Sequence, residues 1–388
     1  MNVAAYLILG RNPFNAADIV RAMAERAIQL GMSIDVADSV EEVPAQQGVG
    51  LIMSRINRSD AEQAVRRRIP TIALFDQTLS DIVPVVVPDE RGLGRMAAEH
   101  LLNQGFKTVS FCGPKMLWSV QRFEGFEQVI QSSQATLHEP LIGETWAELE
   151  TPDMMRQWVE GLPLPIGVMC ANDKLAVRLR NTVFDTGRSV PEDVAIVGVD
   201  NDELRSGYGR VSITSVGLNA AAIGARAADL LADMVRRGIT PPSVTQVPPG
   251  GLFRRRSTDV LRISDPEVLA AVKYIASHFR DGIQVEDVLN HVMVSRSTLD
   301  RRMKQSIGRS CSDEIERIRI SHAKKMLTET DAALSEIAAA CGFNYLSHFS
   351  HAFRQKAGLS PSQYRKLHRF TGNLTENLSI PSRIQDSG

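Results

Sequence analysis

The stretch IAAACGFNYLSHFSHAFRQKAGLSPSQYR, residues 337–365, contains two helical patterns separated by a glycine. Before the break, apolar side chains from Leu334 onward follow the i, i+3, i+4, i+7 spacing of an amphipathic helix. Gly342 supplies a tight turn, because glycine adopts the left-handed backbone conformation at little cost. Phe349 and Phe353 are four residues apart, so both lie on one face of a second helix. The pattern predicts a helix-turn-helix whose second helix leaves its opposite face exposed.

A second copy of this pattern lies upstream. Residues 285–292 repeat the apolar spacing, and Ser295 can cap the helix that follows. Leu299 and Met303 supply the apolar pair of that helix, and residues 314–330 form one long amphipathic helix between the two copies. Any short pair of helices can mimic one helix-turn-helix. Two copies on a rigid connector predict reading helices that enter successive major-groove segments of one duplex, roughly 34 Å apart.

The charge of this part of the chain differs from that of the rest. Residues 266–371 carry 16 Lys and Arg against 11 Asp and Glu, a net charge of +5 within a chain whose total is −1. A basic module beside an acidic one is typical of a protein that binds a polyanion through one half only. Ordinary solvated helices would give the same balance, so charge alone leaves both interpretations open.

The first 250 residues alternate short apolar runs with amphipathic stretches. The runs include AAYLILG, GVGLIMS, TIALFD, TVSFCG, IGVMCA and VAIVGVD. Parallel strands covered by helices on both faces require such continuous runs, so we predict an α/β fold with doubly wound parallel sheets. Polar residues follow four runs, at the sheet edge where such folds bind ligands, although each could instead cap the next helix. They are Asn12, Asp76, Asn172 and Asp200.

A change of composition marks the domain boundary. Residues 238–259, GITPPSVTQVPPGGLFRRRSTD, are rich in Pro, Gly and Arg and cannot continue a helix. We therefore expect an α/β domain at residues 1–250, a linker at 251–265, an all-α domain at 266–370 and a flexible tail at 371–388.

The sequence contains no catalytic motif that stands out. It lacks a dinucleotide-binding glycine loop, a GxxxxGK[ST] loop, a G-x-S-x-G turn and an evident acid and base pair. We therefore expect no enzyme activity, cofactor or metal. The first apolar run is too short to cross a bilayer, so we expect no membrane partner and a cytoplasmic location. The cysteines lack metal-ligand spacing and are expected to be reduced core thiols: Cys112, Cys170, Cys311 and Cys341.

Two segments of the C-terminal domain resemble the AraC/XylS family of regulators. They are SRSTLDRRMKQSIGRS at 295–310 and the stretch at 337–365, whose ending GLSPSQYR is highly specific. The resemblance implies a seven-helix module that binds double-stranded DNA at operator half-sites. The residues implied to face DNA are Arg296, Ser297, Asp300, Arg301, Tyr345, Ser347, His348, Ser350 and His351.

These residues would contact DNA in different ways. Arg301 can donate a bidentate pair to guanine, whereas Arg296 could equally contact phosphate. The position of His351 is often Arg in the family, so we expect weaker or different base reading by the second helix. Asp300 and Ser347 could instead only support the fold.

The N-terminal domain resembles the periplasmic sugar-binding proteins and the effector domains of LacI-type regulators. Six motifs occur in the same order near predicted strand ends: NPF, LFD, RxxGF, ETW, AND and VGVD. The resemblance implies that a sugar's hydroxyls and ring are bound by Asn12, Phe14, Asp76, Arg122, Asn172 and Asp200, with Trp146 stacking or simply packing in the core. Leu218 stands where ribose-type binders often offer Gln. We expect replacement of Arg122 by Ala to abolish sugar binding and leave the fold intact.

The combination of the two resemblances implies a sugar-responsive transcription regulator, with activation of pentose catabolic genes as the expected role. The expected partners are operator DNA, a pentose such as xylose, RNA polymerase, and a second copy in a homodimer, because paired half-sites raise affinity. Two alternatives stay open: a sugar-modifying enzyme fused to a DNA-binding module, and a ligand-blind DNA-bridging protein.

Overall fold

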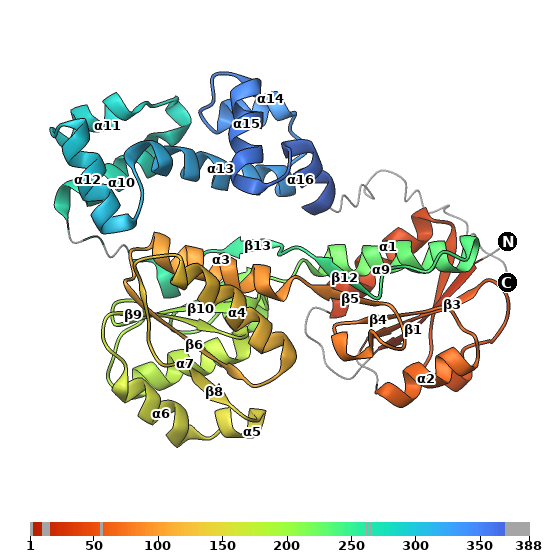
Figure 1. Ribbon diagram of the computed structural model, residues 1–388. Helices are drawn as coiled ribbons and strands as arrows, with labels where there is room; N and C mark the ends of the chain where they lie inside the picture. The colour runs from red at the N-terminus through yellow and green to blue at the C-terminus, as the bar shows by residue number, and fades with distance from the viewer. Residues whose placement is uncertain (1–2, 10–15, 55–56, 261–262, 264, 369–388) are drawn as a thin grey trace, which may run out of the picture.

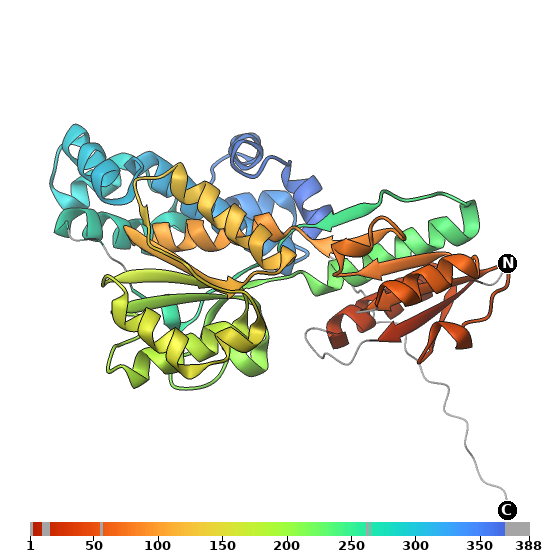
Figure 2. The ribbon, with the colours of Figure 1, turned by 60° about the horizontal axis from the view of Figure 1, so that its bottom comes forward.

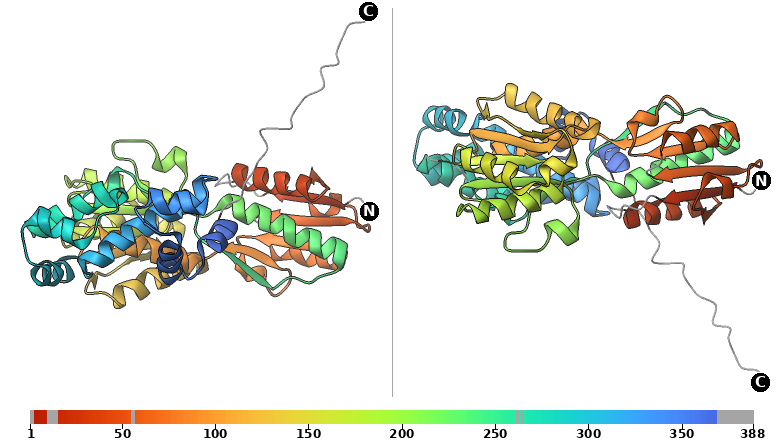
Figure 3. Two further views of the ribbon diagram at one scale, coloured as in Figure 1. Left: turned by 90° about the horizontal axis from the view of Figure 1, so that it is seen from above. Right: turned by 90° about the horizontal axis from the view of Figure 1, so that it is seen from below.

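The computed structural model describes residues 3–9, 16–54, 57–260, 263 and 265–368. Two α/β lobes lie next to each other, and an all-helical module lies along one side of the second lobe (Figures 1 and 2). Seen from above, this module covers the second lobe (Figure 3). The predicted α/β class and the helical C-terminal domain are confirmed.

Lobe 1 is built on a parallel sheet of order β12-β5-β4-β3-β1-β2. Helices α1 and α9 pack together on one face and α2 covers the other, so central strands such as β4 are buried along their whole length. The bounds are β1 Val3–Leu9, α1 Ala16–Gln29, β2 Met32–Val36, η1 Val40–Glu42, β3 Val49–Ser54, α2 Arg58–Arg66, β4 Thr71–Leu74, η2 Gln77–Leu79, β5 Val85–Pro88, α9 Ala220–Arg237 and β12 Val244–Val247.

Lobe 2 contains a second sheet of order β13-β11-β10-β9-β6-β7, in which β8 also pairs with β6 and only β13 runs antiparallel. Its helices surround the largest apolar cluster of the described residues. The bounds are α3 Glu90–Asn103, β6 Thr108–Pro114, α4 Leu117–Gln131, β7 Thr136–Leu137, β8 Leu141–Gly143, α5 Trp146–Leu149, α6 Pro152–Gly161, β9 Ile166–Cys170, α7 Asp173–Asp185, β10 Val194–Asp200, α8 Glu203–Ser206, β11 Thr214–Gly217, β13 Gly251–Phe253 and η3 Arg256–Thr258.

The chain crosses between the lobes after β5, after β11 and after β12. The last crossing shows that the linker expected at 251–265 is shorter than predicted, because the first part of that segment belongs to lobe 2. Strand β13 pairs with β11, and in η3 the hydroxyl of Ser257 donates to the carbonyl of Ile196 on β10. These backbone and hydroxyl groups are satisfied inside the lobe, and Val260 packs against its apolar cluster, so the expected linker belongs to lobe 2 as far as Val260.

The C-terminal module contains seven α-helices among residues 265–368: α10 Pro266–His278, α11 Val285–Val292, α12 Arg296–Ile307, α13 Cys311–Glu329, α14 Leu334–Ala340, α15 Leu346–Ala357 and α16 Pro361–His368, with η4 Phe279–Asp281 after α10. It has two cores. The first half of α13 packs with α10 to α12, and the second half packs with α14 and α15. Helix α13 therefore holds the two helix-turn-helix units at a fixed separation.

Several local predictions in this module are confirmed. Ser295 caps α12, where its hydroxyl accepts the backbone N–H of Thr298. Gly342 has φ +77°, and a Cβ there would lie 2.0 Å from the carbonyl oxygen of Phe279, so the turn requires glycine.

All four cysteines of the chain are buried free thiols. Within the described part of the chain, no helix is both long and apolar enough to cross a membrane.

Candidate functional site

A buried charge cluster lies near the carboxyl ends of the lobe 2 strands. Arg122 of α4 donates from Nε to Glu90 Oε2 at 2.6 Å and from Nη1 to the carbonyl oxygen of Ala171 at 2.5 Å. Nη1 also lies 3.7 Å from Asp200 Oδ1, at the end of β10. The Arg122 side chain is only 5% exposed. A guanidinium held by two carboxylates in this setting is a rigid, charged hydrogen-bonding group.

Two glycines bring this cluster together. A Cβ on Gly94 of α3 would lie 1.9 Å from the carbonyl oxygen of Arg122, and one on Gly125 of α4 would lie 2.0 Å from that of Arg91. The backbones of α3 and α4 therefore approach more closely than any other side chain would allow. This close crossing places Glu90, in the first turn of α3, against Arg122.

Two tryptophans lie next to the charged groups. The Trp118 ring centroid is 4.8 Å from the Arg122 guanidinium, and Trp118 stacks with Trp146 at 6.2 Å between centroids and 29° between planes. The Nζ atom of Lys174, on α7, lies 5.3 Å from the centroid of the Trp146 ring. Aromatic faces beside a buried arginine and carboxylates offer both kinds of contact that a sugar makes, to its C–H face and to its hydroxyls.

Asp173 shapes the loop that carries Asp200. Its buried carboxylate accepts the hydroxyl of Ser215 at 2.7 Å and the backbone N–H of Asp202 at 2.8 Å. Asp200 and Asn201 have φ values of 112° and 53°, a strained conformation for residues other than glycine. We infer that the two hydrogen bonds to Asp173 offset part of this strain.

Burial changes the acidity of the three carboxyl groups. Burial raises the pKa of Asp200 to about 7, with Arg122 opposing and Glu90 adding to the increase. Burial also raises the pKa of Glu90, although Arg122 opposes it. The pKa of Asp173 rises well above its ordinary value through burial and then through the charge of Asp200. The cluster holds more carboxylates than guanidinium groups, so hydroxyl donors from a ligand would stabilise its charged form.

The predicted sugar-binding residues are placed as follows. Asn12 and Phe14 lie outside the described residues. Asp76 follows β4 and accepts the backbone N–H of Thr78 at 3.0 Å, and Asn172 accepts that of Leu175 at 3.0 Å. Both side chains therefore cap helices, as the alternative interpretation allowed. Arg122 and Asp200 lie together in the charge cluster, and Trp146 packs on Trp118.

Contacts between the lobes lie close to Asp76. Phe75 packs against the apolar clusters of both lobes. Gln121 of α4 donates from Nε2 to Gln77 Oε1 of η2 at 3.2 Å. The segment after β4 therefore faces the same helix that carries Arg122.

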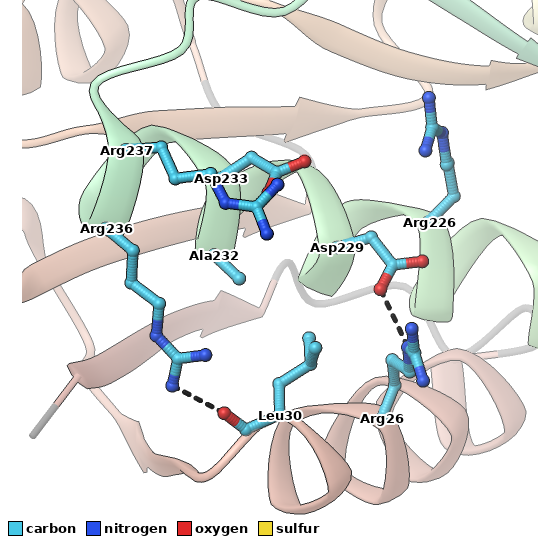
Figure 4. A pocket seen from close by; sticks show the side chains of 8 residues that line it. All are labelled: Arg26, Leu30, Arg226, Asp229, Ala232, Asp233, Arg236 and Arg237. Atoms are coloured by element: carbon cyan, nitrogen blue, oxygen red, sulfur yellow. Dashed lines mark hydrogen bonds and ion pairs between the residues drawn. The ribbon is translucent and has the colours of Figure 1, made fainter.

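A separate groove of about 280 Å³ lies between α1 and α9 on lobe 1 (Figure 4). Arg26 pairs with Asp229 at 2.7 Å, Arg237 pairs with Asp233 at 3.2 Å, and Arg236 donates to the carbonyl oxygen of Leu30. These guanidinium groups are occupied by protein partners, so the groove is a weaker candidate for an effector than the buried cluster.

The first reading helix, α12, presents most of its predicted residues to solvent. Arg296, Ser297 and Arg301 are exposed, and Arg296 lies 3.4 Å from Glu286 in an exposed ion pair. Asp300 is half-buried and accepts the backbone N–H of Cys311 at 3.0 Å, which ties α12 to the start of α13. The supporting role that the sequence left open for Asp300 is therefore the one its geometry favours.

The second reading helix, α15, begins at Leu346. Tyr345, Ser347, His348 and His351 are exposed, and Ser350 is half-buried. Phe349 and Phe353 are fully buried on the opposite face, as predicted. The exposed face therefore has polar and aromatic groups suited to a DNA groove but contains no arginine among these residues.

Sequence reasoning missed three residues in or beside the charge cluster: Glu90, which belongs to it, and Trp118 and Asp173, which lie next to it. Trp118 precedes Arg122 by four residues, a helical spacing that would have indicated a shared face. Asp173 lies in the AND motif, but its buried role depends on Ser215 and on the loop after β10. Glu90 offered no separate signal, because a charged residue in the first turn is common in helices.

Comparisons with known proteins agree with this architecture. The periplasmic binding protein-like domain family matches residues 98–258, and the helix-turn-helix domain family matches residues 288–367. The chain is 28% identical to the xylose operon regulatory protein of Haemophilus influenzae and 29% identical to that of Escherichia coli K12, over 73% of this chain and 74% of each relative.

The fold is shared with a solved structure over almost the whole chain. The structure of the xylose-binding transcription activator XylR superposes with a TM-score of 0.56 at 23% identity, covering 95% of this chain and 99% of that one. The match spans both α/β lobes and the helical module. The chain is therefore a transcription regulator with a periplasmic-binding-protein-like sensor and an AraC-type helix-turn-helix domain, similar to the xylose operon regulatory proteins.

Proposed function

We propose that this regulator binds a pentose such as xylose at the Arg122 cluster and responds by changing its binding to operator DNA. The observation that carries the proposal is the buried Arg122 guanidinium between Glu90 and Asp200, beside the Trp118 ring. Carboxylates accept hydrogen bonds from sugar hydroxyls, the guanidinium donates hydrogen bonds to them, and the indole covers the apolar C–H face. The relatives named for the xylose operon support the choice of a pentose.

The proposed response is a closure of the two lobes around the sugar. Gln77 and Gln121 already join lobe 1 to α4, and three chain crossings provide a hinge. A ligand that contacts both lobes favours the closed form by its differential affinity for that form. Small-angle scattering with and without saturating xylose would detect closure as a smaller radius of gyration.

The output is proposed to be transcription activation in the cytoplasm by a homodimer that contacts RNA polymerase at paired half-sites. Two reading helices per chain on the rigid α13 support binding to successive major-groove segments. Footprinting on the chain's own promoter region would test for paired half-sites. A transcription assay with purified polymerase would then distinguish activation from DNA bridging.

The sugar assignment is tested by calorimetry and thermal shift against a panel of pentoses and hexoses. A ligand at 100 times its dissociation constant adds about 2.7 kcal/mol to the free energy of unfolding. Arg122→Lys keeps the positive charge but loses the forked donor geometry, so we expect it to lose sugar affinity. Arg91→Met, on the exposed side of α3, is the matched control that should bind as the original chain does. A panel without any binder would refute the proposal, and turnover of a sugar would favour the enzyme alternative.

A further inference from the structure

The segment that leads into the helical module contacts the loop after β10, which we call the Asp200 loop. We call residues 251–260 the return segment; it contains β13 and η3. Arg255 lies between these two elements and is half-buried. It donates from Nη2 to the side-chain oxygen of Asn201 at 2.7 Å and from Nη1 to the carbonyl oxygen of Ile213 at 3.0 Å. Because Asn201 directly follows Asp200, one forked guanidinium joins the proposed sugar site to the return segment.

The Asp200 loop is held in a backbone conformation that few residues adopt. Asp200 and Asn201 have φ values of 112° and 53°. The backbone N–H of Asn201 donates to the hydroxyl of Ser215 at 3.0 Å, and its side chain accepts from Arg255. Residues in such sparsely populated conformations persist only where their surroundings hold them, and they are common in segments that switch between two states. A new contact to Asp200 therefore acts on a strained backbone whose next side chain is bonded to Arg255.

The return segment belongs to one hydrogen-bonded network with β11 and α3. The hydroxyl of Thr214 accepts the backbone N–H of Arg255 at 2.8 Å and donates to its carbonyl oxygen at 2.9 Å. The same hydroxyl shares a hydrogen bond of 2.8 Å with that of Thr258. Thr258 in turn contacts α3, through His100 Nε2 at 2.8 Å and through Gln104, which donates to its carbonyl oxygen at 2.9 Å. Connected networks of this kind carry energetic coupling between sites.

A very short tether joins the return segment to the first reading helix. Val260 packs against the lobe 2 cluster, and Ile263 already belongs to the core of the helical module. Only two residues lie between them, so the chain can span at most about 11 Å there at 3.6 Å per residue. Asp265 then caps α10 by accepting the backbone N–H of Val268 at 3.1 Å, and Arg302 of α12 donates to the same carboxylate at 2.7 Å. A shift of the return segment therefore reaches the base of α12.

We propose that Arg255 is a positioning residue that couples the Asp200 loop to the helical module through the return segment. The inference rests on the proposed sugar site for its input, because a sugar hydroxyl bound to Asp200 is what alters the loop. Asn201 then shifts against Arg255, and the return segment and its tether carry that shift to α10 and α12. Arg255 is assigned no contact with sugar or DNA, so its loss should uncouple the two binding functions without removing either.

The test uses three variants of the full chain. Arg255→Met keeps most of the apolar stem of the side chain but removes its hydrogen-bond donors. Arg255→Lys keeps the positive charge but loses the forked geometry that reaches two acceptors on different elements. Arg256→Met removes the same charge from the neighbouring, exposed position and is the matched control.

Two quantities are measured for each variant. Calorimetry gives the xylose affinity without DNA, and fluorescence anisotropy gives the operator affinity with and without saturating xylose. A ligand-induced change of roughly 5- to 150-fold is typical of allosteric proteins, and we expect Arg255→Met to reduce it below about twofold. Arg255→Lys should keep an intermediate change and Arg256→Met the whole of it. The xylose affinity should stay that of the original chain in all three variants, a result that a merely structural role of Arg255 would not give.

The outcomes separate this inference from the proposed function. If the original chain does not bind xylose, or binds it without a change in operator affinity, the proposed function fails and Arg255 has nothing to couple. If xylose changes the operator affinity of Arg255→Met as much as that of the original chain, the proposed function stands and the role of Arg255 is refuted. Should Arg255→Met lose xylose binding, Arg255→Lys decides. Reduced coupling at unchanged xylose affinity then supports the role, and unchanged coupling or lost affinity overturns it.

Discussion

Removing the Arg122 side chain should destabilise lobe 2 strongly. Arg122→Met leaves Glu90 and Asp200 buried without their guanidinium partner. Removing one partner of a buried ion pair lowers the free energy of unfolding by about 3 to 5 kcal/mol. The expectation that the fold would survive this loss intact is therefore not supported by the geometry. Protonation of the carboxyl groups, whose pKa values are already raised, offsets part of the cost.

The same two helices provide a matched control. Arg91 and Glu124 form an exposed pair between α3 and α4, with side chains 46% and 45% exposed. Arg91→Met removes that pair and should cost about 0 to 1 kcal/mol, because exposed pairs are solvated and screened. The double variant Glu90→Gln with Arg122→Met removes the uncompensated charge of Glu90, and it should be more stable than Arg122→Met alone.

The three tryptophans of the chain, Trp118, Trp146 and Trp158, all lie in lobe 2. Tryptophan fluorescence during urea unfolding therefore reports this lobe separately from lobe 1 and the helical module, which matters because a chain of several domains need not unfold in one step. If Arg122→Met lowered the free energy of unfolding of lobe 2 by less than about 1 kcal/mol, as expected for loss of an exposed pair, the reasoning would be refuted. So would a double variant less stable than Arg122→Met.

Three further outcomes are expected. The pKa of Asp200 rises from 3.8 in the unfolded chain to about 7. The stability that this carboxyl group contributes is therefore fully present below pH 3.8 and is lost as pH rises to about 7, by up to about 1.4 kcal/mol per pH unit. Asp200→Asn should flatten that slope in urea unfolding at several pH values. Residues 263–388 expressed alone should fold and bind the operator without a sugar response in fluorescence anisotropy, and a fragment that responds to sugar would contradict this. Arg301→Ala should weaken operator binding by about 1 to 3 kcal/mol and relax base preference at one position, as measured by fluorescence anisotropy on operator variants. If Arg296 contacts phosphate, Arg296→Ala should instead weaken binding to all sequences alike.

The sequence by itself determined the classes of the two domains and many local features of the helical module. Ser295 caps α12 and Gly342 forms the turn before α15 because capping and turn formation depend on residues only a few positions apart. Phe349 and Phe353 are buried because helical spacing places them on one face. Continuous apolar runs likewise indicated strands that are covered on both faces.

Only the tertiary structure decided which distant groups meet. Glu90 pairs with Arg122, 32 residues away, because two glycines let α3 and α4 cross closely. The segment from Gly251 returns to the lobe 2 sheet, where β13 pairs with the outer edge of β11, a partner that Pro and Gly content alone does not reveal. The carboxylate of Asp300 points toward the start of α13, because it accepts a hydrogen bond from the backbone N–H of Cys311. Each of these outcomes depends on packing between elements, and local sequence patterns carry no information about the geometry of that packing.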